Sequence, residues 1–209
     1  TELKALQAQI NPHFLYNTLD SIAWMCERGK NADAVQMVHA LARLFRISIS
    51  RGHELIPIEK ELQHAEAYLQ IQKYRYKNQF TYHFTVDEDC VHCLCNKITL
   101  QPIIENALKH GISQLEHGGR LVISISVDDF THIIIRNDGT NINLEKMQRL
   151  LAFDPNDPTL LNFENEGYGV QNINRRIKLI CGANYGLTYK RTDSQTICTI
   201  LLPVRTSGL

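Results

Sequence analysis

His13 is the first residue whose position suggests chemistry. It stands in the segment 10–19, INPHFLYNTL, whose apolar residues recur at helical spacing. Pro12 precedes it, and a proline inside a helix removes one backbone donor and clashes with a carbonyl one turn earlier, so we expect a kink beside His13. A neutral imidazole that faces solvent on a rigid helix is a competent nucleophile. The plainer interpretation is a surface or core histidine without a chemical role.

The segment 101–111, QPIIENALKHG, combines three polar residue types on one helix face. Asn106, Lys109 and His110 share this face, and apolar residues cover the opposite one. An amide, an ammonium and an imidazole could converge on a polyphosphate and its divalent metal, because Asn supplies a neutral oxygen ligand and Lys a positive charge. The alternative is a solvated face in which Glu105 and Lys109 form an ordinary surface pair.

Two later motifs contain glycines that could approach a ligand closely. The motif RNDGTN, with Asn137, Asp138 and Gly139, follows an apolar strand pattern, although such a tripeptide often forms only a turn. The motif EGYG, with Gly167 and Gly169, precedes an amphipathic helix. Glycines at a helix start allow backbone amides to approach a phosphate, and they would also serve as a hinge.

Helices must position His13. The helical periodicity extends through the first 78 residues, with breaks near Gly29 and between Gly52 and Pro57. We therefore expect an antiparallel helical hairpin, followed by a third helix from about Glu59 to Tyr76.

Strands and helices must position the other candidates. From Phe80 the apolar period changes to two, which indicates a half-buried strand and a domain boundary. The further elements that we expect are a helix over 100–110, strands over 121–127, 133–136, 187–190 and 196–202, and a part-helical, part-loop segment over 140–166. The sequence thus predicts an α+β fold with a helical region over residues 1–78 and a sheet-containing domain over residues 79–209.

Composition narrows the function classes. The chain has 209 residues, with 22 basic and 22 acidic side chains, so no bulk charge predicts a nucleic-acid partner. No apolar run reaches the roughly 18 residues of a membrane helix, and the start at Thr1 suggests a fragment of a longer protein. The cluster of Cys90, His92, Cys93 and Cys95 lacks a second, distant pair of ligands, so we favour apolar loop-edge residues over a zinc site.

Five motifs in this order resemble the cytoplasmic kinase core of LytS/YesM-type sensor histidine kinases. The resemblance covers almost the whole chain, and Asn11 to Asn17, NPHFLYN, is similar to the phosphoacceptor motif of that family. The other matching segments are 44–48 and 58–75 in the helical blocks, 101–111 in the asparagine box, 167–177 in the second glycine box and 196–203 in the last strand.

The resemblance implies a fold and a set of roles. It implies a dimerising helical hairpin that presents His13, followed by an ATP-binding α/β sandwich of the GHKL (Bergerat) type, shared with Hsp90, gyrase and MutL, with a mixed, mostly antiparallel sheet. Asn106 would be a ligand of the Mg²⁺ that bridges the phosphates, with Lys109 and His110 near them. Gly167 and Gly169 would let a lid, residues 151–166, fold over the triphosphate. Asn172 and Arg176 match further positions of the same glycine box.

One motif departs from the family pattern. The family usually has Asp-Asn-Gly-x-Gly where adenine is bound, whereas this chain has Asn137, Asp138, Gly139, Thr140 and Asn141. The adenine-reading carboxylate is thereby replaced by the amide of Asn137, whose oxygen can accept a hydrogen bond but lacks the charge. We expect weaker nucleotide affinity, unless the turn shifts by one position and Asp138 substitutes.

The function implied by the resemblance is ATP-dependent autophosphorylation of His13, followed by phosphoryl transfer to an aspartate of a response regulator. The expected protein is a homodimer on the cytoplasmic side of a membrane, with an upstream sensor or membrane segment absent from this fragment. Two alternatives remain. An ATP hydrolase is disfavoured because Pro102 occupies the position of its general base. A degenerate module that binds nucleotide and dimerises without turnover is favoured only by the altered RNDGTN motif.

Overall fold

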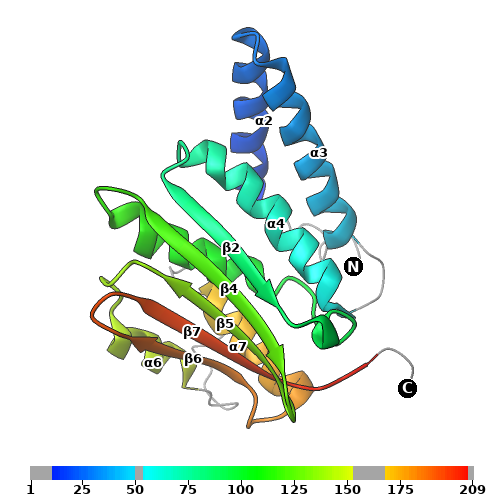
Figure 1. Ribbon diagram of the computed structural model, residues 1–209, viewed down its shortest axis with the longest axis vertical. Coiled ribbons are helices and arrows are strands. Elements are labelled where there is room, and N and C mark those ends of the chain that lie inside the picture. The colour runs from blue at the N-terminus through cyan, green and yellow to red at the C-terminus, as the bar shows by residue number, and fades with distance from the viewer. Residues whose placement is uncertain (1–10, 50–53, 153–167, 207–209) are drawn as a thin grey trace.

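A computed structural model describes residues 11–49, 54–152 and 168–206. The first helices are α2 (Pro12–Glu27), α3 (Asn31–Ser48) and α4 (Ile58–Arg75). In Figure 1, α2 and α3 form a hairpin that projects from the rest of the molecule, and α4 lies between this hairpin and the sheet. The positive φ of 72° at Gly29 allows the tight turn that joins α2 to α3. The predicted hairpin and third helix are therefore present.

The described residues form a sheet of five strands in the order β2-β4-β5-β7-β6. Their bounds are β2 (Phe80–Val86), β4 (Gly119–Val127), β5 (Phe130–Asn137), β6 (Gly186–Arg191) and β7 (Thr196–Pro203). Only β2 and β4 pair in parallel, while the other neighbours are antiparallel. The expected α+β fold with a mixed, mostly antiparallel sheet is confirmed.

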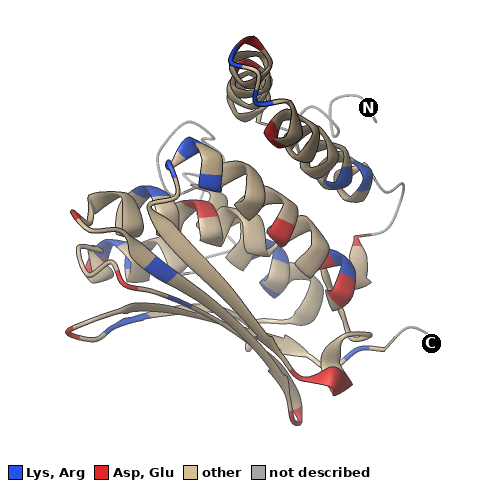
Figure 2. Ribbon diagram, turned by 45° about the horizontal axis from the view of Figure 1, so that its top comes forward, with Lys and Arg blue, Asp and Glu red and all other residues tan. Residues whose placement is uncertain are grey.

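Helices cover one face of this sheet, as Figure 2 shows with the strands nearly edge-on. They include α4, α5 (Leu100–Asn106) with its π-helical continuation Ala107–Gly111, and α7 (Tyr168–Cys181), whereas α6 (Leu144–Leu151) packs beside β6. The core lies between the layers because alternate strand residues such as Ile123, Ile135 and Ile200 are buried, as are Ile103 and Leu69 of the helices. Across the sheet, Ile123 of β4 pairs with Ile135 of β5, and Ile200 of β7 pairs with Ile133 of β5.

Two short strands have no counterpart in the sequence prediction. β1 (Leu55–Pro57) pairs antiparallel with β3 (Leu94–Asn96). Three-residue strands are too short for an alternating apolar pattern to show, and here the cysteine-rich segment supplies one of them. Cys90, Cys93 and Cys95 are all buried, and no group of three potential metal ligands occurs in the described parts of the chain.

Pro12 does not kink a continuous helix. Asn11 is extended, with φ −67° and ψ 112°, and its side chain accepts a hydrogen bond from the backbone N–H of His13 at 3.0 Å. Pro12 is thus the first residue of α2, where its missing N–H costs nothing. The physical reason is that proline disfavours a helical conformation in the residue before it, and Asn is a good N-cap. The expected kink beside His13 is therefore wrong, and His13 lies in the first turn of a helix.

No described helix combines the length and the apolar character needed to cross a membrane.

Candidate functional site

A cleft opens between α5, α6 and the N-terminal end of α7. It contains three cavities, and Asn106 and His110 line all three. The innermost is narrow, about 20 Å³, and reaches down to the sheet. The widest, about 410 Å³, extends along α6, and the third, about 130 Å³, extends toward Gly169. Predicted residues from three separate motifs, including Asn137, therefore line one continuous region.

The asparagine-box helix changes its geometry directly after Asn106. Residues Leu100–Asn106 are α-helical, and the next five form a wider π-turn. Such π-turns often occur at functional sites because they reorient side chains within a helix. Ile104 and Leu108 anchor the apolar face, whereas Lys109 and His110 are exposed at the cleft mouth. The predicted separation of polar and apolar faces is therefore present.

Asn137, at the end of β5, lies at the bottom of the innermost cavity and is 5% exposed. Its Oδ1 accepts a hydrogen bond from the backbone N–H of Gly139 at 2.9 Å. Gly111 packs directly on this oxygen: a Cβ added at Gly111 would lie 2.4 Å from Oδ1. Gly139 and Gly111 also approach each other so closely that a Cβ on Gly139 would lie 2.3 Å from the Gly111 Cα. Two glycines therefore hold the asparagine box against the RNDGTN turn.

Asp138 faces away from this cavity. Its Oδ2 accepts a hydrogen bond from the backbone N–H of Arg120, at 2.8 Å, on the neighbouring strand β4. The turn is therefore not shifted by one position, and the residue presented to the cavity is the amide of Asn137.

The second glycine box is described only in part. Gly169 lines the third cavity, and a Cβ there would approach Pro102 Cβ to 3.1 Å, so this glycine permits close packing of α7 on α5. Asn172 is exposed on α7 and lines none of the three cavities. Gly167 lies outside the described residues, as does nearly all of the predicted lid over 151–166.

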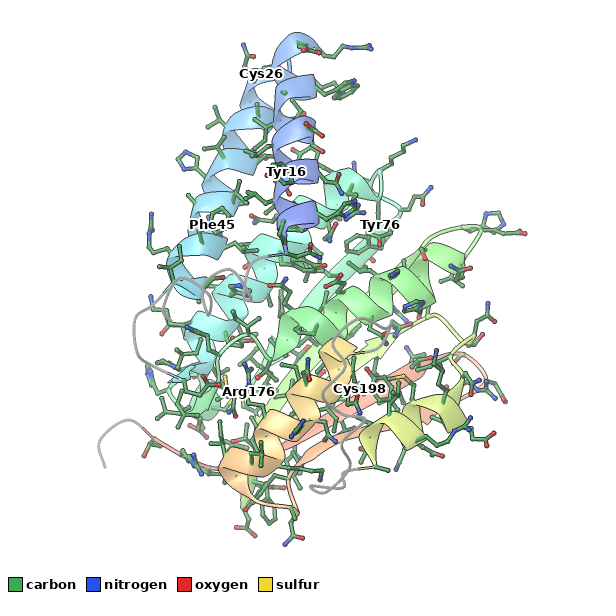
Figure 3. The ribbon with its side chains drawn as sticks, turned by 180° about the vertical axis from the view of Figure 1, so that it is seen from behind. Tyr16, Cys26, Phe45, Tyr76, Arg176 and Cys198 are labelled. Atoms are coloured by element: carbon green, nitrogen blue, oxygen red, sulfur yellow. The ribbon has the colours of Figure 1, made fainter. Side chains whose placement is uncertain are left out.

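Arg176 is not brought into the cleft. Its guanidinium donates to the backbone carbonyl of Lys97 and lies 3.3 Å from Glu54 Oε1. Figure 3 shows Arg176 on α7, apart from Cys198 of the innermost cavity. In this structure the side chain braces the segment before α5 and lines none of the three cavities.

Sequence reasoning missed the residues that β6 and β7 contribute to the innermost cavity: Tyr189, Thr196 and Cys198. The Thr196 hydroxyl donates to the carbonyl of Gly139 at 2.5 Å, which ties β7 to the RNDGTN turn. Burial raises the pKa of Cys198 to about 12 and raises that of Tyr189 well above its usual value, so both groups are neutral. The alternation of these strands predicts burial, but only strand pairing shows which residues meet: Thr196 of β7 lies opposite Asn137 of β5, and Tyr189 of β6 lies opposite Cys198.

His13 lies apart from this cleft, exposed on α2. Asn17, one turn later, places its Nδ2 3.2 Å from the imidazole Nδ1. The following residue, Phe14, is buried and packs against Tyr68 of α4 with ring centroids 5.3 Å apart. Phe14 thus fixes the first turn of α2, while His13 faces solvent.

Comparison with known proteins identifies the family. Residues 95–206 match the family of histidine kinase-, DNA gyrase B- and HSP90-like ATPases, and residues 1–80 match the histidine kinase family. The chain is 32% identical over 207 residues to the sensor histidine kinase YesM of Bacillus subtilis, and 33% identical over 206 residues to BtsS of Escherichia coli. Each alignment covers 98% of this chain and 34% of the relative, so the chain spans about a third of these relatives' length.

Solved structures show the same fold. The catalytic domain of histidine kinase ThkA superposes with a TM-score of 0.52 at 12% identity, covering 73% of this chain and 97% of that one. The histidine kinase domain of the blue-light activated kinase EL346 from Erythrobacter litoralis superposes with a TM-score of 0.51 at 14% identity, covering 97% and 91%. The chain therefore belongs to the sensor histidine kinases of the LytS/YesM type, with an ATP-binding domain related to those of DNA gyrase B and HSP90.

Proposed function

We propose that this chain is the kinase core of a two-component sensor, which transfers the γ-phosphoryl group of ATP to His13 and then to an aspartate of a response regulator. The observation that carries the proposal is the convergence of Asn106, His110 and Asn137 on one cleft, together with an exposed histidine on a separate helix. A phosphoryl donor and its acceptor need such separate, positionable sites, because catalysis here is chiefly alignment and charge neutralisation.

The chemical step needs no further covalent group. A lone pair of the His13 imidazole forms a bond to the γ-phosphorus while the bond from that phosphorus to the β,γ-bridging oxygen breaks, and ADP leaves. An aspartate oxygen of the response regulator then displaces the imidazole, which regenerates neutral His13. We propose that Lys109 and His110, which are exposed and line the third cavity, bind the phosphates.

The cleft also fits a Mg²⁺ ion. Asn106 provides a neutral amide oxygen, and Glu105 lines the same cavity. These residues fit Mg²⁺ because the ion usually binds one or two protein oxygens, together with phosphate oxygens and water. Asn106 would hold the ion, which would neutralise charge on the phosphates when bound. At the position of a hydrolase general base, Pro102 offers no proton acceptor, which favours transfer to His13 over hydrolysis.

The organisation of the chain supports this scheme. We propose that residues 1–78 form the dimerisation and phosphotransfer region and that residues 79–209 form the ATP-binding domain. In the structure α4 packs against both α3 and α5, so it is the physical link between these parts. We further propose that the chain acts on the cytoplasmic side of a membrane, as the kinase end of a longer sensor.

Labelling with [γ-³²P]ATP tests the proposal. We expect phosphohistidine in the wild-type chain and none in His13→Gln. His39→Gln is the matched control, because His39 is also exposed on the hairpin but lies on α3. Asn106→Ala should abolish labelling as well, since it removes the proposed metal ligand. Equal labelling of His13→Gln and wild type would show that another residue accepts the phosphoryl group.

A further inference from the structure

Tyr189 of β6 carries a buried hydroxyl group without a hydrogen-bond partner. The residue is 6% exposed and lines the innermost cavity, and its Oη is unpaired within the part of the chain that the structure describes. A phenylalanine would fill the same space without burying a polar atom. Because buried hydroxyl groups are nearly always paired, an unpaired one in the wall of a cleft points to a role that involves its neighbours there.

Two polar side chains of this cavity are already committed to another group. The Thr196 hydroxyl donates to the carbonyl of Gly139, and Asn137 Oδ1 accepts from the N–H of the same glycine. Cys198, labelled in Figure 3, pairs directly with Tyr189 across the strands, and its sulfur is a weak acceptor for the phenol proton. The lone pairs of Tyr189 Oη therefore remain available for a donor.

Asn106 can supply that donor. It lines the same cavity, whose volume of about 20 Å³ is little more than one water molecule needs, so the polar groups around it lie close together. Burial raises the pKa of Tyr189 and Cys198 adds to this rise, whereas the Asn106 side chain opposes it. A neighbouring amide lowers the pKa of a phenol when its N–H points at the phenol oxygen, because that hydrogen bond favours the charged form. The amide nitrogen of Asn106 therefore faces Tyr189, which leaves the amide oxygen for the cleft.

We propose that Tyr189 is a positioning residue for Asn106: its hydroxyl accepts a hydrogen bond from the amide nitrogen and thereby directs the amide oxygen toward Mg²⁺. Without such a partner the amide could turn over and present an N–H to the ion, which repels it. A group that fixes the orientation of a metal ligand usually matters nearly as much as the ligand itself. The inference rests on the proposed function, because it assumes that Asn106 holds the ion that bridges the phosphates.

Calorimetric titration of the full 209-residue chain with ADP tests this role, once with Mg²⁺ in excess and once with EDTA. ADP is used because it cannot donate a γ-phosphoryl group. Mg²⁺ should strengthen the binding of ADP to the wild-type chain. Tyr189→Phe, which removes only the hydroxyl, should lose most of this gain, since losing the partner of a metal ligand commonly costs roughly 10- to 100-fold in metal affinity. Its affinity for ADP in EDTA should stay close to the wild-type value.

Tyr185→Phe is the matched control for the loss of a phenol hydroxyl. Tyr185 packs against Phe130 and lines none of the three cavities, so this variant should keep the full gain from Mg²⁺. Asn106→Ala removes the proposed ligand itself and should lose the gain completely.

The outcomes separate this inference from the proposed function. If Asn106→Ala loses the gain while Tyr189→Phe keeps it, the positioning role is overturned and the metal site stands. Equal weakening of ADP binding by Tyr189→Phe with and without Mg²⁺ would also overturn it, because the hydroxyl would then act through packing or on the nucleotide. A gain that persists in Asn106→Ala would refute the metal ligand and the positioning role together. If the folded wild-type chain bound ADP under neither condition, the proposed function itself would fail.

Discussion

His64, on α4, is fully buried, and among the described residues only one of its two ring nitrogens has a hydrogen-bond partner. Its Nε2 lies 3.0 Å from Ser48 Oγ, and that hydroxyl donates to the carbonyl of Leu44. The imidazole must therefore donate from Nε2, which leaves Nδ1 as an unpaired acceptor among the described residues. Burial, and next the charge of Lys97, lower the pKa of His64 to about 4, so the ring is neutral in the folded protein at pH 7.

This shift predicts how stability depends on pH. The unfolded chain takes up a proton on His64 near pH 6.5 and the folded chain only near pH 4, so this contribution is complete above pH 6.5 and is lost as the pH falls toward 4. We expect the free energy of unfolding in urea to fall by about 2 kcal/mol between pH 7 and pH 5 through this residue alone.

Comparing the pH dependence of stability in two histidine variants isolates the contribution of His64. His64→Gln should lose this part of the pH dependence, whereas His39→Gln, which changes an exposed histidine of α3, should retain it. An identical pH dependence in His64→Gln and wild type would mean that His64 does not titrate between folded and unfolded states.

Gly111 lies so close to Asn137 that the structure has no room for a side chain at this position. A Cβ there would lie 2.4 Å from Asn137 Oδ1, well inside van der Waals contact, so Asn137 or the π-turn must move. We expect Gly111→Ala to weaken nucleotide diphosphate binding by roughly tenfold, measured by calorimetry.

A double-mutant cycle provides the control for this prediction. Adding Asn137→Ala removes the atom that the new methyl group meets, so the double variant should lose less than the sum of the single losses. Additive losses would place the effect of Gly111→Ala elsewhere in the helix.

At the scale of elements, Glu61 connects α4 to the start of α5. This carboxylate is buried, and it accepts from the backbone N–H groups of Ile98, Thr99 and Leu100 at 3.0, 2.7 and 2.9 Å. Three N–H groups that would otherwise be unpaired at a helix start are thereby satisfied. Burial raises the pKa of Glu61, although these donors and Arg176 oppose the rise. Glu61 therefore fixes the end of the helix that carries Asn106.

We predict that Glu61→Gln lowers stability and nucleotide affinity together. A glutamine can accept with only one oxygen, so its amide would oppose at least one of the three N–H donors, at a cost of about 2 kcal/mol. Thermal unfolding and calorimetric titration with nucleotide diphosphates measure the two effects. Glu59→Gln, an exposed position on the same helix, should change neither. A Glu61→Gln chain with wild-type values for both would refute the positioning role.

The elements differ in how well the sequence predicts them. The alternation of Phe80–Val86 and the helical face of the asparagine box are local patterns, and both elements form where they were expected. Pro12 was misjudged because a helical apolar pattern does not show where a helix begins, whereas the cap formed by Asn11 does. The contacts of Arg176 with Glu54 and Lys97 could not be predicted, because these partners lie far away in the sequence and are brought near only by the packing of α7.

At the scale of the whole molecule, the helical hairpin leaves apolar surface uncovered. Its inner side is buried, with Met37 and Leu44 of α3 at 2% and 4% exposure. Large apolar side chains on both helices are nevertheless exposed: Tyr16, Leu19, Trp24, Val35 and Val38. Since the hairpin projects beyond the sandwich, no described part of the chain covers these residues (Figure 1). A second copy of the hairpin would bury them, as the proposed homodimer requires.

We therefore predict that charges on this surface separate the dimer without unfolding its subunits. The double variant Leu19→Lys/Val38→Lys should give the mass of a single chain in sedimentation velocity at micromolar concentration, where the wild-type chain gives twice that mass. Each subunit should stay folded, because exposed substitutions usually change stability by about 0.5 kcal/mol or less. Leu179→Lys is the matched control: Leu179 is 67% exposed on α7, away from the hairpin, and its replacement should leave the dimer intact. A wild-type chain that sediments as a monomer, or a dimer that persists in the double variant, would show that the hairpin surface is not the interface.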